Sequence, residues 1–216
     1  MKEIVNYQRG IRFYLLLGFV VLFSFVFIIN NALPYFDINS PVYDTEKIRP
    51  FTGALLAHIL FGIVALLTGI SQFYTSLSKR NKYFHRFLGR LYFISVLLSA
   101  LASIYLSVFH AIIDRGYITF GIGLLGLAFA WLSTSVMAFV AIINKQISQH
   151  KEWVLRSYVV TCGFILFRMV FGTLEQVLQV SHIDSGNIAA WVCWSIPLLI
   201  CEIIIQSKKV IFQNKF

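Results

Sequence analysis

Six long apolar runs dominate this sequence and restrict the folds open to it. Each run is long enough for a helix to cross the hydrocarbon core of a bilayer, which takes about 17–25 residues. The runs are continuous, whereas the strands of a transmembrane β-barrel alternate apolar and polar residues. The sequence therefore predicts an all-α polytopic membrane protein, a single six-helix bundle over residues 1–216. The predicted spans are 13–29, 51–74, 91–113, 117–143, 153–180 and 188–205.

Composition and cysteine placement agree with this fold class. Hydrophobic residues make up 58% of the chain and charged residues 12%, whereas a soluble domain is about 45–50% apolar and about 25% charged. Cys162, Cys193 and Cys201 all fall inside predicted spans, so they indicate no disulfide framework. The first run is longer than the apolar region of a signal peptide and precedes no A-x-A-like site, so we expect a retained helix.

Basic residues are distributed unevenly between the two sides of the predicted bundle. Of eighteen Lys and Arg residues, fourteen lie on one side, three on the other, and Arg168 lies inside a span. The positive-inside rule therefore predicts that both termini are cytoplasmic. Because the net charge of +9 is spread along this boundary, we expect the lipid bilayer as partner and no nucleic acid. The oligomeric state is not predicted.

One face of the second run is small in its middle and polar at its ends. His58, Gly62, Ala65, Gly69 and Gln72 recur at offsets of four, three, four and three, which places them on one helix face. Small residues let helices approach closely, and His or Gln hydrogen-bonds between helices, so packing explains part of this pattern. A sharper interpretation is that Gly62 leaves an open slot beside His58 for a flat ligand.

A second polar cluster, YFHRFLGRLY at residues 83–92, directly precedes the third run. His85 lies one turn from Gly89, while Arg86 and Arg90 form a cationic strip suited to carboxylates or phosphates. A cytoplasmic cluster of basic residues is also the ordinary topology signal and attracts anionic lipid. The sequence leaves open whether this cluster is only an anchor or also the inner wall of a site.

The fifth run carries an arginine where a span rarely tolerates one. Arg168 lies about 22 Å along the helix axis from Trp153, which predicts a position deep in the outer half of the bilayer. Arginine at such a depth must face protein, water or a ligand. Glu175, two turns further on, is the candidate partner of Arg168, in a structural ion pair or beside a bound ligand. Glu202 in the sixth run is expected to extend to the membrane interface.

Four histidines at two depths suggest an alternative function. We expect His58 and His110 in the outer half of the bundle, and His85 and His150 at the cytoplasmic boundary. Paired imidazoles at two levels resemble the dihaem b-type cytochromes of the ascorbate-reducible group, which implies haem b held by these four metal ligands. No H-E-x-x-H motif, nucleophile elbow or phosphate-binding glycine loop occurs in the spans, so hydrolytic or nucleotide chemistry gains no support.

Three ordered motifs carry a second resemblance. They are His58-x3-Gly62 continuing to Gln72, then His85-Arg86-x2-Gly89-Arg90-x-Tyr92, then His150-x2-Trp153-x2-Arg156-Ser157. In this order, over roughly Phe51 to Gln179, the chain resembles a bacterial multi-pass membrane family catalogued as domain of unknown function 2306. The resemblance implies no activity, but it directs attention to His58, Gln72, His85, Arg86, Gly89, Arg90, His150, Trp153, Arg156 and Arg168.

Three function hypotheses follow, and the sequence does not decide whether the protein is an enzyme. The first is binding of a small amphipathic or anionic molecule, quinone-like or lipid-like, between the second, third and fifth helices, with transport of that molecule as an option. The second is haem-dependent electron transfer across the membrane, and the third is a structural membrane subunit. The predicted ligand-binding residues are His58, Gly62, Gln72, His85, Arg86, Gly89, Arg90, His150, Arg156, Arg168 and Glu175.

Overall fold

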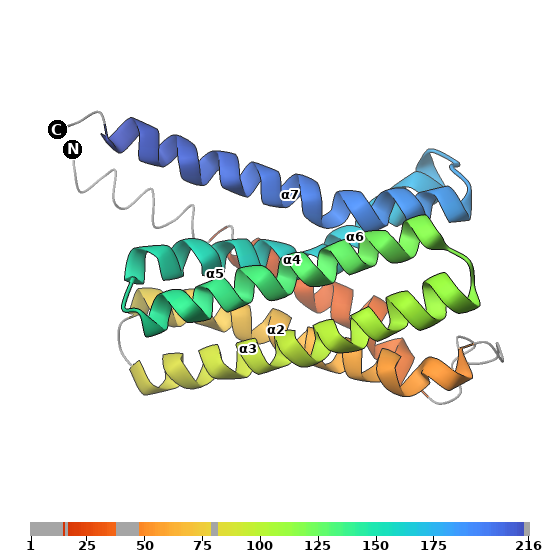
Figure 1. Ribbon diagram of the computed structural model, residues 1–216, viewed down its shortest axis with the longest axis horizontal. Coiled ribbons are helices and arrows are strands. Elements are labelled where there is room, and N and C mark those ends of the chain that lie inside the picture. Colours follow the sequence, from red (N-terminus) through yellow and green to blue (C-terminus); the bar gives the residue numbers. More distant parts are fainter. Residues whose placement is uncertain (1–14, 16, 38–47, 79–81, 214–216) are drawn as a thin grey trace.

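The molecule is a bundle of long helices that run side by side along its longest axis (Figure 1). The computed structural model describes residues 15, 17–37, 48–78 and 82–213, and every regular element among them is helical. Six stretches are long and apolar enough to cross a membrane: Leu17–Phe36, Arg49–Thr75, Lys82–Asp114, Ile118–Ile143, Ile147–Val177 and His182–Ile211. The predicted all-α, six-span fold is thereby confirmed; the start of the first predicted span, at residue 13, lies outside the described residues.

Several helices extend beyond the apolar runs. Residues 17–27 are helical, followed by η1 (Ile28–Ala32), η2 (Leu33–Phe36) and, after the next loop, η4 (Arg49–Phe51). The remaining elements are α2 (Thr52–Ser78), α3 (Lys82–Tyr105), η5 (Leu106–Asp114), α4 (Ile118–Ile143), α5 (Ile147–Thr161), α6 (Gly163–Gly172), η6 (Thr173–Val177) and α7 (His182–Gln213). Because Lys, Arg, Gln and Glu are good helix formers, α3 and α5 begin in polar sequence before their apolar runs.

Neighbouring spans are held together by close packing of small side chains and by buried polar contacts. The most extensive packing is α2 against α3, α4 against α5, and α6 against α7. Ala65, Val96, Ala100, Trp131 and Val160 belong to one buried cluster at the centre of the bundle. Because lipid tails are as apolar as these side chains, the stability of such an interface depends on fit and hydrogen bonds rather than on removal from water.

A buried group of hydrogen-bonded side chains, the central hydroxyl network, connects α3, α4 and α5. Its members are Tyr92, Trp131, Ser135, Ser157 and Thr161. The Tyr92 hydroxyl lies 2.6 Å from Ser157 Oγ and 2.8 Å from Thr161 Oγ1. Trp131 Nε1 donates to Thr161 Oγ1 at 2.8 Å, and Ser135 Oγ lies 2.7 Å from Ser157 Oγ. Each helix supplies groups whose partners lie on another helix, so the network fixes the axial register of all three.

Removal of the Tyr92 hydroxyl should weaken the bundle measurably. Tyr92→Phe leaves Ser157 and Thr161 with one hydrogen bond fewer each, which we expect to lower the free energy of unfolding by about 1 kcal/mol. Reversible unfolding in mixed micelles measures the change, and the double variant with Ser157→Ala should show non-additive loss. Tyr105→Phe is the control, because Tyr105 lies on the same span with 43% of its surface exposed. Equal effects of the two tyrosine variants would contradict a role for the network.

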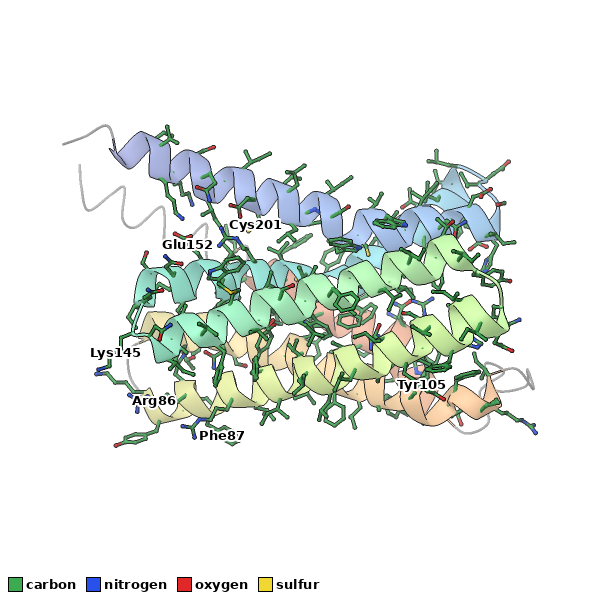
Figure 2. The ribbon with its side chains drawn as sticks, in the orientation of Figure 1. Arg86, Phe87, Tyr105, Lys145, Glu152 and Cys201 are labelled. Atoms are coloured by element: carbon green, nitrogen blue, oxygen red, sulfur yellow. The ribbon has the colours of Figure 1, made fainter. Side chains whose placement is uncertain are left out.

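The two ends of the bundle differ in charge. Figure 2 shows Arg86 and Lys145 at one end, which we call the basic end, and Tyr105 toward the other. Lys82 and Arg90 lie with Arg86 in the first turns of α3. Lys151 lies in the first turns of α5, which begins two residues after Lys145. The basic residues Lys2, Arg9, Arg12, Lys47, Lys79, Arg80 and Lys215 lie outside the described residues. Cytoplasmic placement of both termini stays a prediction from the sequence.

Candidate functional site

His58 points from α2 toward α3, as the face pattern predicted. Its Nδ1 donates to the Ser99 backbone carbonyl at 3.0 Å, and Ser99 Oγ donates to the His58 carbonyl at 2.8 Å. Ser99 is fully buried. The pair therefore ties two neighbouring spans together through reciprocal contacts between one side chain and the opposite backbone.

The predicted slot beside His58 is filled. A Cβ placed on Gly62 would lie 3.3 Å from Cζ of Phe164, and the Phe164 ring centroid is 5.2 Å from that of His58. About two turns further along α2, a Cβ on Gly69 would overlap the ring of Tyr158. The prediction of an open slot for a flat ligand is therefore wrong, because Phe164 and Tyr158 of the fifth span occupy the space beside the two glycines. The packing interpretation of this face holds instead.

At the basic end, His85 of α3 contacts α2 through both its backbone carbonyl and its ring. Gln72 Nε2 donates to the His85 carbonyl at 2.6 Å, and Thr75 Oγ1 lies 2.9 Å from His85 Nδ1. The Gln72 amide packs beside Gly89, where a Cβ would lie 3.5 Å from Gln72 Nε2, an ordinary van der Waals contact. Gln72 of α2 thus packs against His85 and Gly89 of α3 and connects the two helices.

The arginines of the same stretch lie elsewhere. Arg86 and Arg90 are exposed, so they do not share an enclosed space with His85. His150 Nδ1 donates to the Ala138 carbonyl at 2.8 Å, which ties α5 to α4. His85 and His150 are nevertheless close enough for their charges to interact. Each of these two histidines is hydrogen-bonded to a different neighbouring helix, His85 to Thr75 of α2 and His150 to Ala138 of α4.

The outer histidine pair does not have the geometry that a shared haem requires. His58 contacts Ser99 on α3, whereas the His110 ring packs on Phe51 with centroids 4.8 Å apart. His110 is eleven residues beyond Ser99 along the same span, about 16 Å on the helix axis. Two axial imidazoles must face each other across one iron atom, so pairing of His58 with His110 on one haem is wrong. Among the described residues, no three His, Cys, Asp or Glu side chains gather as a metal site.

Arg168 and Glu175 are not partners. Arg168 is exposed, and its Nη2 donates to the Tyr35 hydroxyl of the first span at 2.9 Å. Glu175 Oε1 lies 2.7 Å from Nδ1 of His182 at the start of α7. The predicted Arg168–Glu175 pair is therefore wrong, because each side chain finds a nearer partner on a different span. Arg168 faces outward instead of into the space between the second, third and fifth helices.

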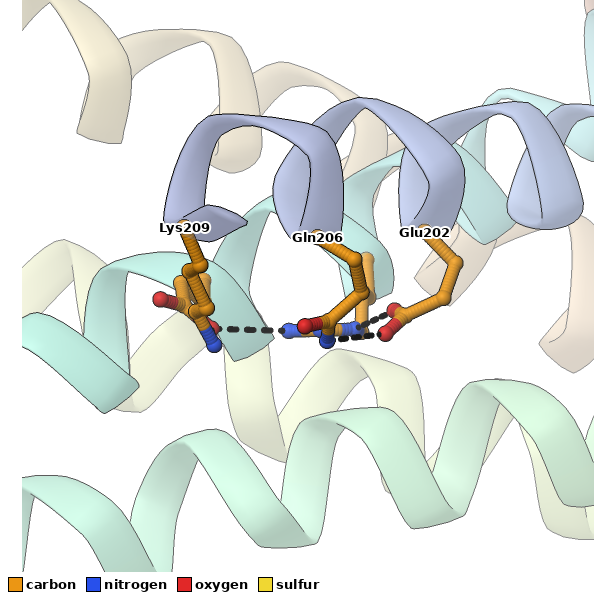
Figure 3. Close-up of polar contacts among 5 residues, drawn as sticks. Glu202, Gln206 and Lys209 are labelled. Carbon is orange, nitrogen blue, oxygen red and sulfur yellow. Dashed lines mark hydrogen bonds and ion pairs between the residues drawn. The ribbon is translucent and has the colours of Figure 1, made fainter. Parts of the chain in front are cut away.

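Charged and polar side chains of α5 and α7 form a connected group around the buried Arg156, which we call the α5–α7 charge cluster. Arg156 Nε donates to Glu202 Oε2 at 2.7 Å, and Gln206 Nε2 donates to Glu202 Oε1 at 2.6 Å (Figure 3). Lys209 Nζ donates to Glu152 Oε2 at 2.7 Å, and Arg156 Nη1 lies 3.7 Å from the same carboxylate oxygen. Glu202 therefore pairs with Arg156 while 41% of its side chain stays exposed, and its extension to the membrane interface stays a prediction.

Arg156 is the enclosed member of this cluster. Only 6% of its surface is exposed, and its guanidinium carbon lies 4.5 Å from the centroid of the Trp153 ring. Such a stacked arrangement is favourable for a cation over an indole. Its Nη1 is buried and makes no hydrogen bond. Arg156 Nη1 is thus a buried donor that has no hydrogen-bond acceptor in the cluster.

A cavity of about 570 Å³ adjoins the α5–α7 charge cluster. Figure 2 shows Glu152 and Cys201 where α5 and α7 face each other, beside the C-terminal part of α7, which inclines away from the bundle. The volume lies within the range of about 300–1,000 Å³ that is usual for small-molecule sites. Its walls come from three helices and include Thr134 of α4, Trp153 and Arg156 of α5, and Trp194, Leu198 and Glu202 of α7.

The sequence interpretation placed a site on the second, third and fifth spans and missed most of this cavity. Of the predicted residues, Trp153 and Arg156 line it. A signal for the others was present: Glu152 and Arg156 are four residues apart, and Glu202, Gln206 and Lys209 follow at offsets of four and three. Residues at these spacings share a helix face. Two such polar faces on apolar helices predict contact with each other, although they do not show which helices meet.

The cavity and the charge cluster lie mainly within a region that matches a known family. The sequence profile of the family described as "Predicted membrane protein (DUF2306)" matches residues 55–205. The chain belongs to this family. The DUF2306 region begins within α2 and ends within α7, so it contains the cavity residues from Thr134 to Glu202, while Gln206 and Lys209 lie beyond it. No curated protein and no solved structure matches the chain.

Proposed function

We propose that this multi-pass membrane protein binds a small amphipathic molecule in the cavity between α4, α5 and α7. The observation that carries the proposal is a cavity with the buried Arg156 at one end and apolar side chains at the other. Binding sites for small molecules are commonly apolar with a few convergent polar groups, and this cavity has that character. The basic end, which contains the charge cluster, would then lie at the cytoplasmic face of a bacterial inner membrane.

The arrangement suits a molecule with a polar head and an apolar tail. The head would meet Arg156, Gln206 and Lys209, while the tail would lie along Leu198 and Leu199. Leu199 is 60% exposed and faces the region that lipid would fill. A tail can therefore enter sideways from the bilayer without crossing an aqueous phase. This route explains why an exposed apolar surface and a buried cation occur in one cavity.

The alternatives from the sequence gain less support. A haem between His58 and His110 conflicts with their separation along the helix axis. Transport of the bound molecule and a structural role as a membrane subunit stay predictions. The proposed ligand site also moves from the second, third and fifth spans to the fourth, fifth and sixth, because the earlier location is filled by Phe164 and Tyr158.

A cavity-filling variant tests the proposal without knowledge of the ligand. Leu198→Trp should place an indole in the cavity, and we expect an amphipathic compound that copurifies with the native protein to be lost from this variant by at least tenfold. The measurement is mass spectrometry of organic extracts from protein purified in maltoside micelles. Ile203→Trp is the matched control, because Ile203 lies on the same helix, is 56% exposed and does not line the cavity.

The outcome depends on the comparison of the two tryptophan variants. Both should give monodisperse protein with similar thermal stability, since Trp is tolerated on an apolar helix. A compound present in native and Ile203→Trp protein but depleted from Leu198→Trp protein supports the cavity as its site. Identical extracts from all three proteins would reject the proposed function.

A further inference from the structure

We infer that the head of the ligand carries no net charge and accepts a hydrogen bond through a flat ring carbonyl, as a benzoquinone does. This inference rests on the proposed function and names its ligand class. Three features of the cavity support it: the charge balance of the α5–α7 charge cluster, the free donor of Arg156, and the indoles of Trp153 and Trp194.

The charges of the cluster already balance. Arg156 and Lys209 supply two positive charges, and Glu152 and Glu202 supply two negative charges, with each cation in contact with a carboxylate. A carboxylate or phosphate head would leave one uncompensated negative charge in a space bounded by apolar helices. A cationic head would leave one positive charge. The head would lie beside the buried Arg156 Nη1, where an unpaired charge is costly, so the balanced cluster disfavours both.

A neutral acceptor would give Arg156 Nη1 the hydrogen bond that it lacks in the cluster. Arg156 Nη1 is buried without a hydrogen bond, and its 3.7 Å separation from Glu152 Oε2 is too long for one. Buried donors are nearly always satisfied in folded proteins, so this one indicates an absent acceptor. A carbonyl oxygen would accept from Nη1 and add no charge. Gln206 and Lys209 are exposed and also line the cavity, so they are the polar side chains that the head would meet beside Nη1.

Two indoles favour a flat head over a branched one. Trp153 and Trp194 both line the cavity, from α5 and α7 respectively. Aromatic faces gain most from offset stacking or edge contacts with another ring. Arg156 already lies over the Trp153 ring, at 4.5 Å from its centroid, so a ring carbonyl near Trp153 would also be near the guanidinium. A phosphocholine head would offer neither a stacking face nor a planar acceptor.

A set of probes with similar chains tests the inference. Decyl-substituted benzoquinone, decanoate, decylammonium and dodecylphosphocholine are titrated into purified protein in maltoside micelles, and the shift of the thermal unfolding midpoint gives an apparent Kd for each. We expect the quinone to bind at least tenfold more tightly than each of the other three. Its shift should disappear in Leu198→Trp and persist in Ile203→Trp.

Variants that change the charge balance provide a second readout. Glu202→Gln should give the cluster a net positive charge, so the affinity for decanoate relative to the quinone should rise at least tenfold. Gln206→Glu should give a net negative charge and favour decylammonium in the same way. Gln206 is exposed, so its variant is expected to fold even where Glu202→Gln weakens the α5–α7 contact.

The possible failures of inference and proposed function are distinct. If decanoate, decylammonium or dodecylphosphocholine binds most tightly and Leu198→Trp abolishes that binding, the inference of an uncharged ring is overturned. The cavity would still be a binding site. Absence of any quinone-induced shift would overturn the inference as well. Binding that Leu198→Trp leaves unchanged, for every probe, would reject the cavity and with it the proposed function.

Discussion

Arg156→Ala is expected to lower the free energy of unfolding by about 2–3 kcal/mol. The substitution removes the contacts of α5 with Glu202 on α7 and leaves two carboxylates without their shared cation. Loss of one partner from a fully buried pair costs roughly 3–5 kcal/mol. Glu202 and Glu152 are 41% and 24% exposed at their side chains, so water compensates part of the loss. Reversible unfolding in mixed micelles gives the value.

Arg168→Ala is the matched control for this prediction. Arg168 belongs to the same span and also donates to another span, but it is exposed and contacts a single tyrosine hydroxyl. A hydrogen bond between helices in a membrane contributes about 0.6 kcal/mol on average, so we expect a change below about 1 kcal/mol. A larger loss for Arg168→Ala than for Arg156→Ala would show that the outer contact with Tyr35, rather than the charge cluster, holds the fifth span in place.

Gly69→Ala should destabilise the bundle by about 1–3 kcal/mol, because a single methyl group has no room there. A Cβ at this position would overlap the ring of Tyr158 and lie 3.3 Å from Cε2 of Tyr92. Tyr158 is 7% exposed, and its ring meets Phe73 at a centroid distance of 5.1 Å. The ring therefore cannot retreat without displacing its neighbours. The same unfolding measurement, together with yield of monodisperse protein, records the effect.

Two further variants separate this clash from a general effect of alanine. Gly53→Ala lies on the same helix with nothing within 4 Å of the added carbon, so it should be neutral or stabilise by up to about 1 kcal/mol through helix propensity. Tyr158→Leu removes the opposing ring and should make Gly69→Ala less harmful in the double variant than in the native background. Equal loss in both backgrounds would mean that Tyr158 is not what confines Gly69.

These predictions concern two different roles of polar and small residues in the membrane. The glycines of α2 make room for aromatic rings of the fifth span, and the central hydroxyl network aligns α3, α4 and α5. Every side chain of the central hydroxyl network has a hydrogen-bond partner within the network. The α5–α7 charge cluster differs, because it borders a cavity and leaves Arg156 Nη1 without a hydrogen bond. That difference is why the proposed ligand lies at the cluster and not at the glycine face.

Particular residues show how far sequence reasoning reached. It correctly identified His58 as an inward-facing residue from helical spacing. It also named Arg156 from the family motif, and the role of Arg156 in a binding site stays a prediction. It paired Arg168 with Glu175 because they lie on one helix two turns apart, whereas the partners are Tyr35 and His182 on other spans. It also treated Gly62 as an empty slot, although the Phe164 ring fills it. Each error concerns a neighbour from a distant part of the chain.

The sequence by itself determined the membrane class, the six spans and the membership in the DUF2306 family. It could do so because transfer of an apolar run into lipid, and the hydrogen bonding of its backbone within one helix, depend on residues that are contiguous in the chain. The tertiary structure decided which helix faces meet, and hence that α4, α5 and α7 line an open cavity while α2 and the fifth span pack against each other. In a bilayer, lipid and neighbouring helices are almost equally good partners for apolar side chains, so the choice of face rests on shape and on a few polar pairs that only spatial proximity reveals.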